Sequence, residues 1–172
     1  MALTLVATAG ASNANTYATL AEGDTYHEGH LYSSLWDDAS DDTKNRALAM
    51  ATRLLDALIE WTGAAVSQGQ ALGWPRVGML SRNGYVLSSA TIPEDLKKGT
   101  AEFARQLIGG DRSADSDIET QGITSLTAGP VSLAFKDSVE AKVVPDAVWA
   151  LLPASWGFIR GRSGTMVPLV RG

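Results

Sequence analysis

The chain has 172 residues, 45% of them hydrophobic, so it can bury one sizeable core and has the usual length of a single domain. Its 19 acidic and 14 basic residues give a net charge of -5, which disfavours a broad surface for nucleic acid or anionic membrane. The absence of cysteine excludes disulfides and thiol chemistry, and no apolar run approaches the ~20 residues that span a bilayer.

The N-terminal region is predicted to hold a short strand and a first helix. Residues 1–14 lack the basic start of a signal peptide, and residues 3–6, Leu-Thr-Leu-Val, have the pattern of a strand that leads into a polar turn. Thr19 and Glu22 form a capping-box pattern, so we expect a helix to begin there and to continue to about Leu31.

The strongest helical pattern covers residues 41–61. Ser40 can supply the N-cap oxygen, and two aspartates follow it at the positive end of the helix dipole. Apolar residues recur at helical spacing from Leu48 to Ile59. This pattern predicts a core helix that is ended by Gly63.

Residues 63–90 show no sustained period but are rich in glycine, serine and asparagine, which predicts a long ordered loop or a loose hairpin. Loops of this length in compact domains are usually functional. The next helix is predicted to begin at a Thr91–Glu94 capping pair, with Pro93 in its first turn, and to end at the two glycines of residues 109–110.

The C-terminal part of the chain predicts a β-hairpin, a short helix and an arm. Residues 123–127 and 131–135 flank an Ala-Gly-Pro turn, and apolar and small residues alternate over 131–135, which indicates a hairpin at about residues 123–136. A last helix is expected within residues 145–153. The fold class is therefore mainly α: a small helical bundle with a β-hairpin, residues 1–153, and an extended C-terminal arm, residues 154–172.

The arm is basic and partly apolar. All acidic residues lie at or before Asp146, so the last 26 residues carry three unopposed arginines, +3 against -8 in the rest of the chain. Its glycines disfavour a helix, while its apolar residues favour a protein groove, so we predict a docking arm. The same arginines could instead face DNA. The residues of the predicted arm are Trp156, Phe158, Ile159, Arg160, Arg162, Met166, Leu169 and Arg171.

The long loop contains a cluster that combines aromatic and basic residues, as single-stranded nucleic acid requires. We expect this cluster to pack on the bundle or on a neighbouring subunit, because the acidic total charge opposes DNA. The predicted interface loop consists of Trp74, Pro75, Arg76, Arg82 and Tyr85.

We predict no catalytic, cofactor-binding or metal site. His27 and His30 lie three residues apart beside Asp24 and Glu28, but a closed metal site needs further ligands and the sequence offers no third cluster. Neither a nucleophile elbow nor a phosphate-binding glycine loop is present in the sequence. An enzyme is therefore not expected.

Several strings resemble the head-to-tail adaptor, or head-completion, proteins of tailed bacteriophages. They are Asn-Ala-Asn-Thr-Tyr at residues 13–17, Gln-Ala-Leu-Gly-Trp-Pro-Arg-Val-Gly at 70–78, Ile-Pro at 92–93 and Gly-Pro-Val-Ser-Leu at 129–133. The resemblance covers roughly residues 13–152. Proteins similar to this one are also labelled DnaT-like single-stranded DNA-binding proteins, which is the alternative function.

The adaptor resemblance implies a virion structural protein made in the host cytoplasm and located in the neck, at the head-tail junction. It implies a homo-oligomeric ring, about twelve copies, closed by a repeated head-to-tail interface. The implied partners are the portal protein, on which the predicted arm of residues 154–172 would dock, and a downstream neck or tail-completion protein. Genomic DNA would only pass through the channel, and no cofactor or membrane is involved.

Overall fold

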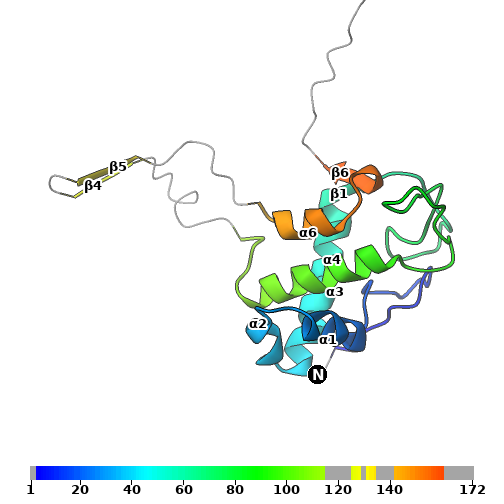
Figure 1. Cartoon of the computed structure of the whole chain (residues 1–172), viewed down its shortest axis with the longest axis horizontal. Helices are drawn as coiled ribbons and strands as arrows, with labels where there is room; N and C mark the ends of the chain where they lie inside the picture. The colour runs from blue at the N-terminus through cyan, green and yellow to red at the C-terminus, as the bar shows by residue number, and fades with distance from the viewer. Residues whose placement is uncertain (1–2, 115–124, 129–130, 135–141, 161–172) are drawn as a thin grey trace, which may run out of the picture.

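The computed structural model describes residues 3–114, 125–128, 131–134 and 142–160, which form a mainly α-helical body and a separate β-hairpin (Figure 1). The two long helices, α3 (Asp41–Leu58) and α4 (Glu94–Ile108), cross at the centre of the body. The short helices α1 (Leu20–Glu28) and α2 (Ser34–Asp37) lie at one end of this pair, and α6 (Asp146–Leu151) packs on α4 near the other end. The predicted fold class is confirmed.

Helix α3 begins as the sequence predicts and ends earlier. The Ser40 hydroxyl accepts a hydrogen bond from the backbone N–H of Thr43 at 3.3 Å. The helix ends at Leu58, because the next three residues form strand β1 (Ile59–Trp61), which pairs antiparallel with β6 (Gly157–Ile159). The prediction of a helix up to Trp61 was therefore wrong at its C-terminal end. Residues 59–61 have helical spacing of apolar residues but pair with β6, about a hundred residues away in the sequence.

The two other predicted capping pairs have different outcomes. The Thr19–Glu22 capping box is present, since the Thr19 N–H donates to the Glu22 carboxylate at 2.7 Å and the Glu22 N–H donates to the Thr19 hydroxyl at 3.2 Å. The N-cap of α4 is Pro93, with no side-chain cap, so the assignment of Thr91 was wrong. Helix α1 ends before Gly29, which leaves Leu31 outside it.

The N-terminal segment contains no strand, contrary to the prediction for residues 3–6. Asn15 holds this segment instead. Its side-chain oxygen accepts from the Val6 N–H at 2.8 Å, its amide donates to the Thr4 carbonyl at 2.9 Å, and its backbone N–H donates to the Val6 carbonyl at 2.9 Å. The side chain and the backbone of Asn15 therefore satisfy three backbone groups of these extended residues, in place of a sheet.

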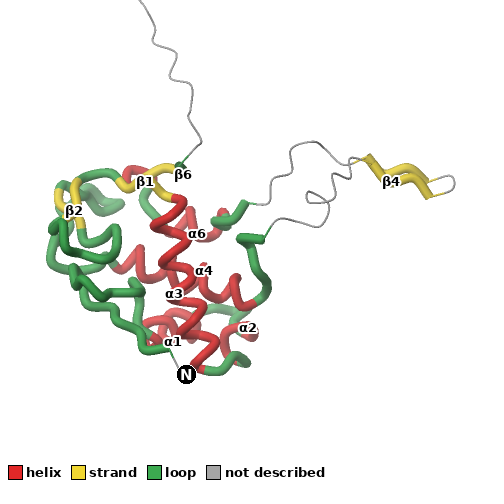
Figure 2. Tube along the Cα trace, turned by 180° about the vertical axis from the view of Figure 1, so that it is seen from behind, coloured by secondary structure: helices red, strands yellow, loops and turns green. Residues whose placement is uncertain are grey.

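The long loop between α3 and α4 is ordered, as the sequence predicts, and lies on one side of the helices (Figure 2). It contains the short antiparallel pair β2 (Ala64–Ala65) and β3 (Arg76–Val77), and a bridge between Leu80 and Val86. It also contacts the N-terminal segment, where the Ala71 N–H donates to the Ala11 carbonyl at 3.1 Å.

The predicted hairpin is present as β4 (Ser125–Ala128) and β5 (Val131–Ala134), paired antiparallel with Ser125 opposite Ala134. Helix α6 also falls inside its predicted range. A 3₁₀ turn, η1 (Ala154–Trp156), then connects α6 to β6.

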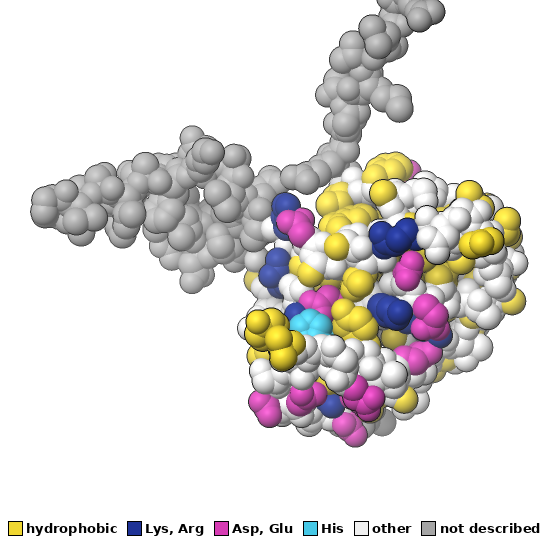
Figure 3. Space-filling view, in the orientation of Figure 1, with side chains coloured by type: hydrophobic (Ala, Val, Ile, Leu, Met, Phe, Trp, Pro, Cys, Tyr) yellow, Lys and Arg dark blue, Asp and Glu magenta, His cyan; other side chains and the backbone are white. Residues whose placement is uncertain are grey.

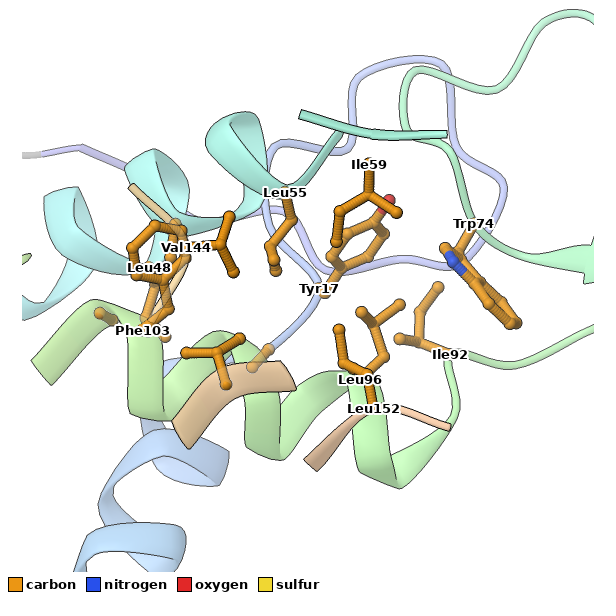
Figure 4. Close-up of a cluster of buried hydrophobic side chains, with 14 of the residues drawn as sticks. Tyr17, Leu48, Leu55, Ile59, Trp74, Ile92, Leu96, Phe103, Val144 and Leu152 are labelled. Atoms are coloured by element: carbon orange, nitrogen blue, oxygen red, sulfur yellow. The ribbon is translucent and has the colours of Figure 1, made fainter. Parts of the chain in front are cut away.

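The core lies between α3, α4, α6 and the long loop (Figure 4). Its side chains come from residues 5–108 and 143–156, so these two stretches form one packed unit. Full burial of a leucine or phenylalanine contributes about 1.5–3 kcal/mol relative to exposure. The most deeply buried large side chains include Tyr17, Trp36, Leu48, Leu55, Ile59, Trp74, Leu96, Phe103, Val148 and Trp156.

Within the described ranges, no helix combines the length and the hydrophobicity required to cross a membrane.

Candidate functional site

The predicted interface loop and the start of the predicted arm meet in the core. The Trp74 ring lies 4.7 Å from the Trp156 ring and 5.8 Å from the Trp61 ring, centroid to centroid. Trp74 and Trp156 are each 1% exposed, and the Trp156 indole N–H donates to the Leu80 carbonyl at 2.7 Å. These two tryptophans belong to the subunit's own core.

This placement bears on two expectations. Trp74 and Pro75 are buried against the bundle, which is one of the two locations that the sequence allowed. Trp156 and Ile159 are held by η1 and by β6, so the arm cannot begin at residue 154. The glycines and prolines near Trp156 suggested an extended arm. The strand that pairs with β6 is β1, which lies about a hundred residues earlier, so no local pattern indicated the pairing.

Asp56 connects helix α3 to the loop and is not among the residues that the sequence singles out. Its carboxylate accepts from the Trp61 indole N–H at 2.8 Å, from the Gly73 backbone N–H at 2.9 Å and from the Tyr17 hydroxyl. Burial, followed by the charge of Asp56, raises the pKa of Tyr17 well above its ordinary value. The available signal was an acidic residue directly after Leu55, close to the buried face of the helix.

The loop arginines are engaged within the subunit. The Arg76 guanidinium donates to the Gly73 and Gly63 carbonyls, both at 2.9 Å. Arg82 donates to the Ala150 and Leu151 carbonyls at 3.1 and 3.0 Å, which caps the end of α6. These bonds brace the loop and engage both Nη atoms of Arg76 and the Nη2 atom of Arg82.

Tyr85 and Arg82 are the exposed members of the predicted loop cluster, and Tyr85 is 75% exposed. It belongs to a larger set of exposed apolar side chains on the loop, which we call the loop patch. A braced loop that keeps apolar side chains in water is typical of a protein-binding surface. The loop patch consists of Val66, Val77, Leu80, Tyr85 and Val86.

A second exposed apolar group, the α2 patch, lies at the opposite end of α4. It consists of Leu31, Tyr32 and Leu35, of which Leu31 is 86% exposed. Arg105 of α4 donates to the Tyr32 carbonyl at 3.3 Å and so ties this end to the bundle.

The two histidines have structural partners. His27 is 1% exposed, its Nε2 lies 3.1 Å from the Ala101 carbonyl, and burial lowers its pKa. His30 Nε2 lies 3.6 Å from the Glu102 carboxylate. Burial alone would raise the pKa of Glu102, but hydrogen bonds from Arg105 and Gln106 lower it overall. In the part of the chain that the structure describes, no three histidine, aspartate or glutamate residues are grouped as metal ligands.

Acidic and basic side chains are interspersed on the face of the body shown in Figure 3. Several cations are paired: Lys97 Nζ lies 2.7 Å from Glu22, Arg46 lies 2.8 Å from Asp42, and Lys142 lies 2.8 Å from Asp146. This mixture does not form a broad basic groove.

The C-terminal end of the described chain has an exposed arginine and no acidic residue after Asp146. Phe158 of β6 is 53% exposed, and Arg160 is exposed while its backbone N–H donates to the Leu58 carbonyl at 2.7 Å. The other predicted arm residues, Arg162, Met166, Leu169 and Arg171, lie outside the described residues.

The model of one protein family, described as "Putative DnaT-like ssDNA binding protein", matches residues 1–172. No curated protein and no solved structure matches the chain.

Proposed function

The chain belongs to the family of DnaT-like single-stranded DNA-binding proteins, and on this basis we propose that it binds single-stranded DNA and catalyses no reaction. The observation that carries the proposal is that the family model matches the whole chain. The loop cluster is a poor location for the DNA, because Trp74 is buried and Arg76 and Arg82 donate to backbone carbonyls.

The C-terminal end is the better location for DNA contact. Residues 147–172 contain Arg160, Arg162 and Arg171 and no acidic residue, which gives them a charge of +3. Arg160 is exposed at the end of β6. Contacts from these arginines to phosphates would give affinity without base specificity, and a local basic segment can do this on a chain of net charge -5.

The test is an anisotropy titration with a labelled oligo-dT at several salt concentrations. Arg160→Gln, Arg162→Gln and Arg171→Gln are combined in one variant. Three phosphate contacts predict a log–log salt slope of about -2 for the natural chain, since each contact on a single strand contributes about -0.7. The triple variant should lose most of the affinity and most of the slope.

A matched control removes the same amount of charge elsewhere. Arg46→Gln, Arg53→Gln and Lys98→Gln combine three exposed cations of α3 and α4. This control should keep the affinity within about twofold, because its net charge equals that of the first variant. Equal losses in both variants, or no binding at low salt, would reject the proposal.

The exposed loop patch favours a second candidate function, the phage head-to-tail adaptor. Its apolar side chains are 43–81% exposed on a loop that Arg76, Arg82 and Asp56 brace. A neighbouring copy in a ring, or the portal, would cover them. In this proposal the protein is a virion component, a subunit of a ring that joins the portal to the downstream neck protein, with DNA passing through.

Native mass spectrometry of the protein, alone and with a portal, tests this candidate. Tyr85→Ser with Val86→Ser should convert assemblies to monomers, because both exposed side chains belong to the patch. Leu31→Ser with Tyr32→Ser is the control at the other end of the body, and it should still assemble. A natural chain that stays monomeric at high concentration, with and without portal, would contradict the adaptor role.

A further inference from the structure

A small apolar groove lies beside the last described strand. Trp149 of α6 and Phe158 and Ile159 of β6 line it, and the ion pair between Lys142 and Asp146 borders it. Its volume is about 320 Å³, at the small end of the range for ligand pockets. It can therefore take a few side chains.

The chain itself supplies a suitable occupant. It leaves the described structure at Arg160, one residue after Ile159. Residues 161–165, Gly-Arg-Ser-Gly-Thr, are followed by Met-Val-Pro-Leu-Val at residues 166–170. We propose that residues 166–170 of the same chain dock in this groove.

The linking segment is long enough for a return to the groove. Five residues span at most about 17 Å when extended, whereas three strand residues cover about 10 Å. Gly161 and Gly164 allow backbone conformations that a reversal requires and that other residues adopt at a cost. Docking within the chain also avoids the loss of translational freedom that a separate peptide would have.

The groove and the segment match in their apolar side chains. Trp149, Phe158 and Ile159 line the groove, and residues 166–170 are Met-Val-Pro-Leu-Val. Asp146, the one carboxylate in the lining, is paired with Lys142, so the docking rests on the apolar residues and not on Arg162 or Arg171. It is therefore independent of the DNA contacts proposed for those arginines and of the adaptor role.

Cysteine cross-linking of the full chain tests the proposal, and the chain has no native cysteine to interfere. Asp146→Cys at the groove border is combined with Leu169→Cys, and oxidation is followed by non-reducing electrophoresis and peptide mapping. The matched control combines Arg46→Cys, exposed on α3, with the same Leu169→Cys. The groove pair should form an intramolecular disulfide at least about tenfold faster than the control, because docking raises the local thiol concentration.

A further substitution distinguishes cross-linking that results from docking from cross-linking by random collision of the two cysteines. Val167→Asp in the Asp146→Cys, Leu169→Cys background should slow cross-linking to the control rate, because a carboxylate in an apolar groove is disfavoured. Equal rates for the groove pair and the control would overturn the proposal, and so would an unchanged rate with Val167→Asp. A cross-link that joins two chains would assign the groove to a second copy instead and would also overturn it.

Discussion

At the scale of single residues, Asp56 has the clearest structural role. Its carboxylate oxygens accept hydrogen bonds from Tyr17, Trp61 and Gly73, so one side chain of α3 fixes the start of the chain, β1 and the loop. An amide at this position would keep only one accepting oxygen and would direct a donor at another donor.

Asp56→Asn should therefore lower the free energy of unfolding by about 1–3 kcal/mol, the cost of leaving buried donors unsatisfied. Urea denaturation followed by tryptophan fluorescence measures it. Asp38→Asn, at an exposed position after α2, is the control and should change stability little. If both variants unfold at the same urea concentration as the natural chain, Asp56 does not hold the loop.

His27 predicts a pH dependence of stability. Burial lowers the pKa of His27, so the folded state favours the neutral ring, whose Nε2 donates to the Ala101 carbonyl. The unfolded chain takes up this proton near pH 6.5, before the folded chain does, so stability should fall as the pH drops below about 6.5. The loss can reach about 1.4 kcal/mol by pH 5.5.

The comparison of unfolding free energies at pH 7.5 and 5.5 checks this. His27→Gln should be less stable at pH 7.5 and should show a much smaller change between the two pH values. His30→Gln should keep the change. Glu22 and Glu102, whose pKa values are lowered, affect stability only at more acidic pH, near 4.5 and below. A full drop in His27→Gln would rule out His27 as the source.

At the scale of elements, Ser40 and Thr91 both look like N-cap residues in the sequence, but only Ser40 caps a helix in the structure. Ser40 accepts from the Thr43 N–H, whereas Thr91 lies two residues before the N-cap of α4 and is exposed. Ser40→Ala should cost about 1 kcal/mol, the usual value of an N-cap, and Thr91→Ala should cost almost nothing. Thermal unfolding of the two variants measures the difference. A larger effect at Thr91 would mean that α4 starts where the sequence pattern placed it.

Element ends were predictable only where the signal was local. The capping box of α1, the N-cap of α3 and the hairpin between β4 and β5 depend on neighbouring residues, and each occurs as expected. The end of α3 depends on β6, which lies about a hundred residues away, and three-residue strands carry too little alternation to be recognised. Tertiary pairing decided that boundary.

At the scale of the whole molecule, the difference between local and long-range contacts also explains which candidate sites could be predicted. Residue types identified the loop as important but could not show that Trp74 packs against Trp156 or that Arg82 reaches α6. Aromatic and basic residues in a loop suit a core, a protein interface or a nucleic-acid surface equally well. Burial separates these roles, and it is a property of the folded chain.

The boundary of the folded body gives the last prediction. Truncation after Pro153 removes Trp156, which is 1% exposed and donates to the Leu80 carbonyl, together with the strand that pairs with β1. Truncation after Arg160 leaves these contacts in place. The shorter chain should lose at least about 3–5 kcal/mol, the usual cost of removing a buried tryptophan, and the longer chain should stay within about 1 kcal/mol of the natural protein. Urea unfolding of both truncations, with Trp156→Ala in the full chain as a check on the tryptophan itself, measures these values. If the two truncations are equally stable, β6 and Trp156 do not belong to the body, and the arm begins at residue 154.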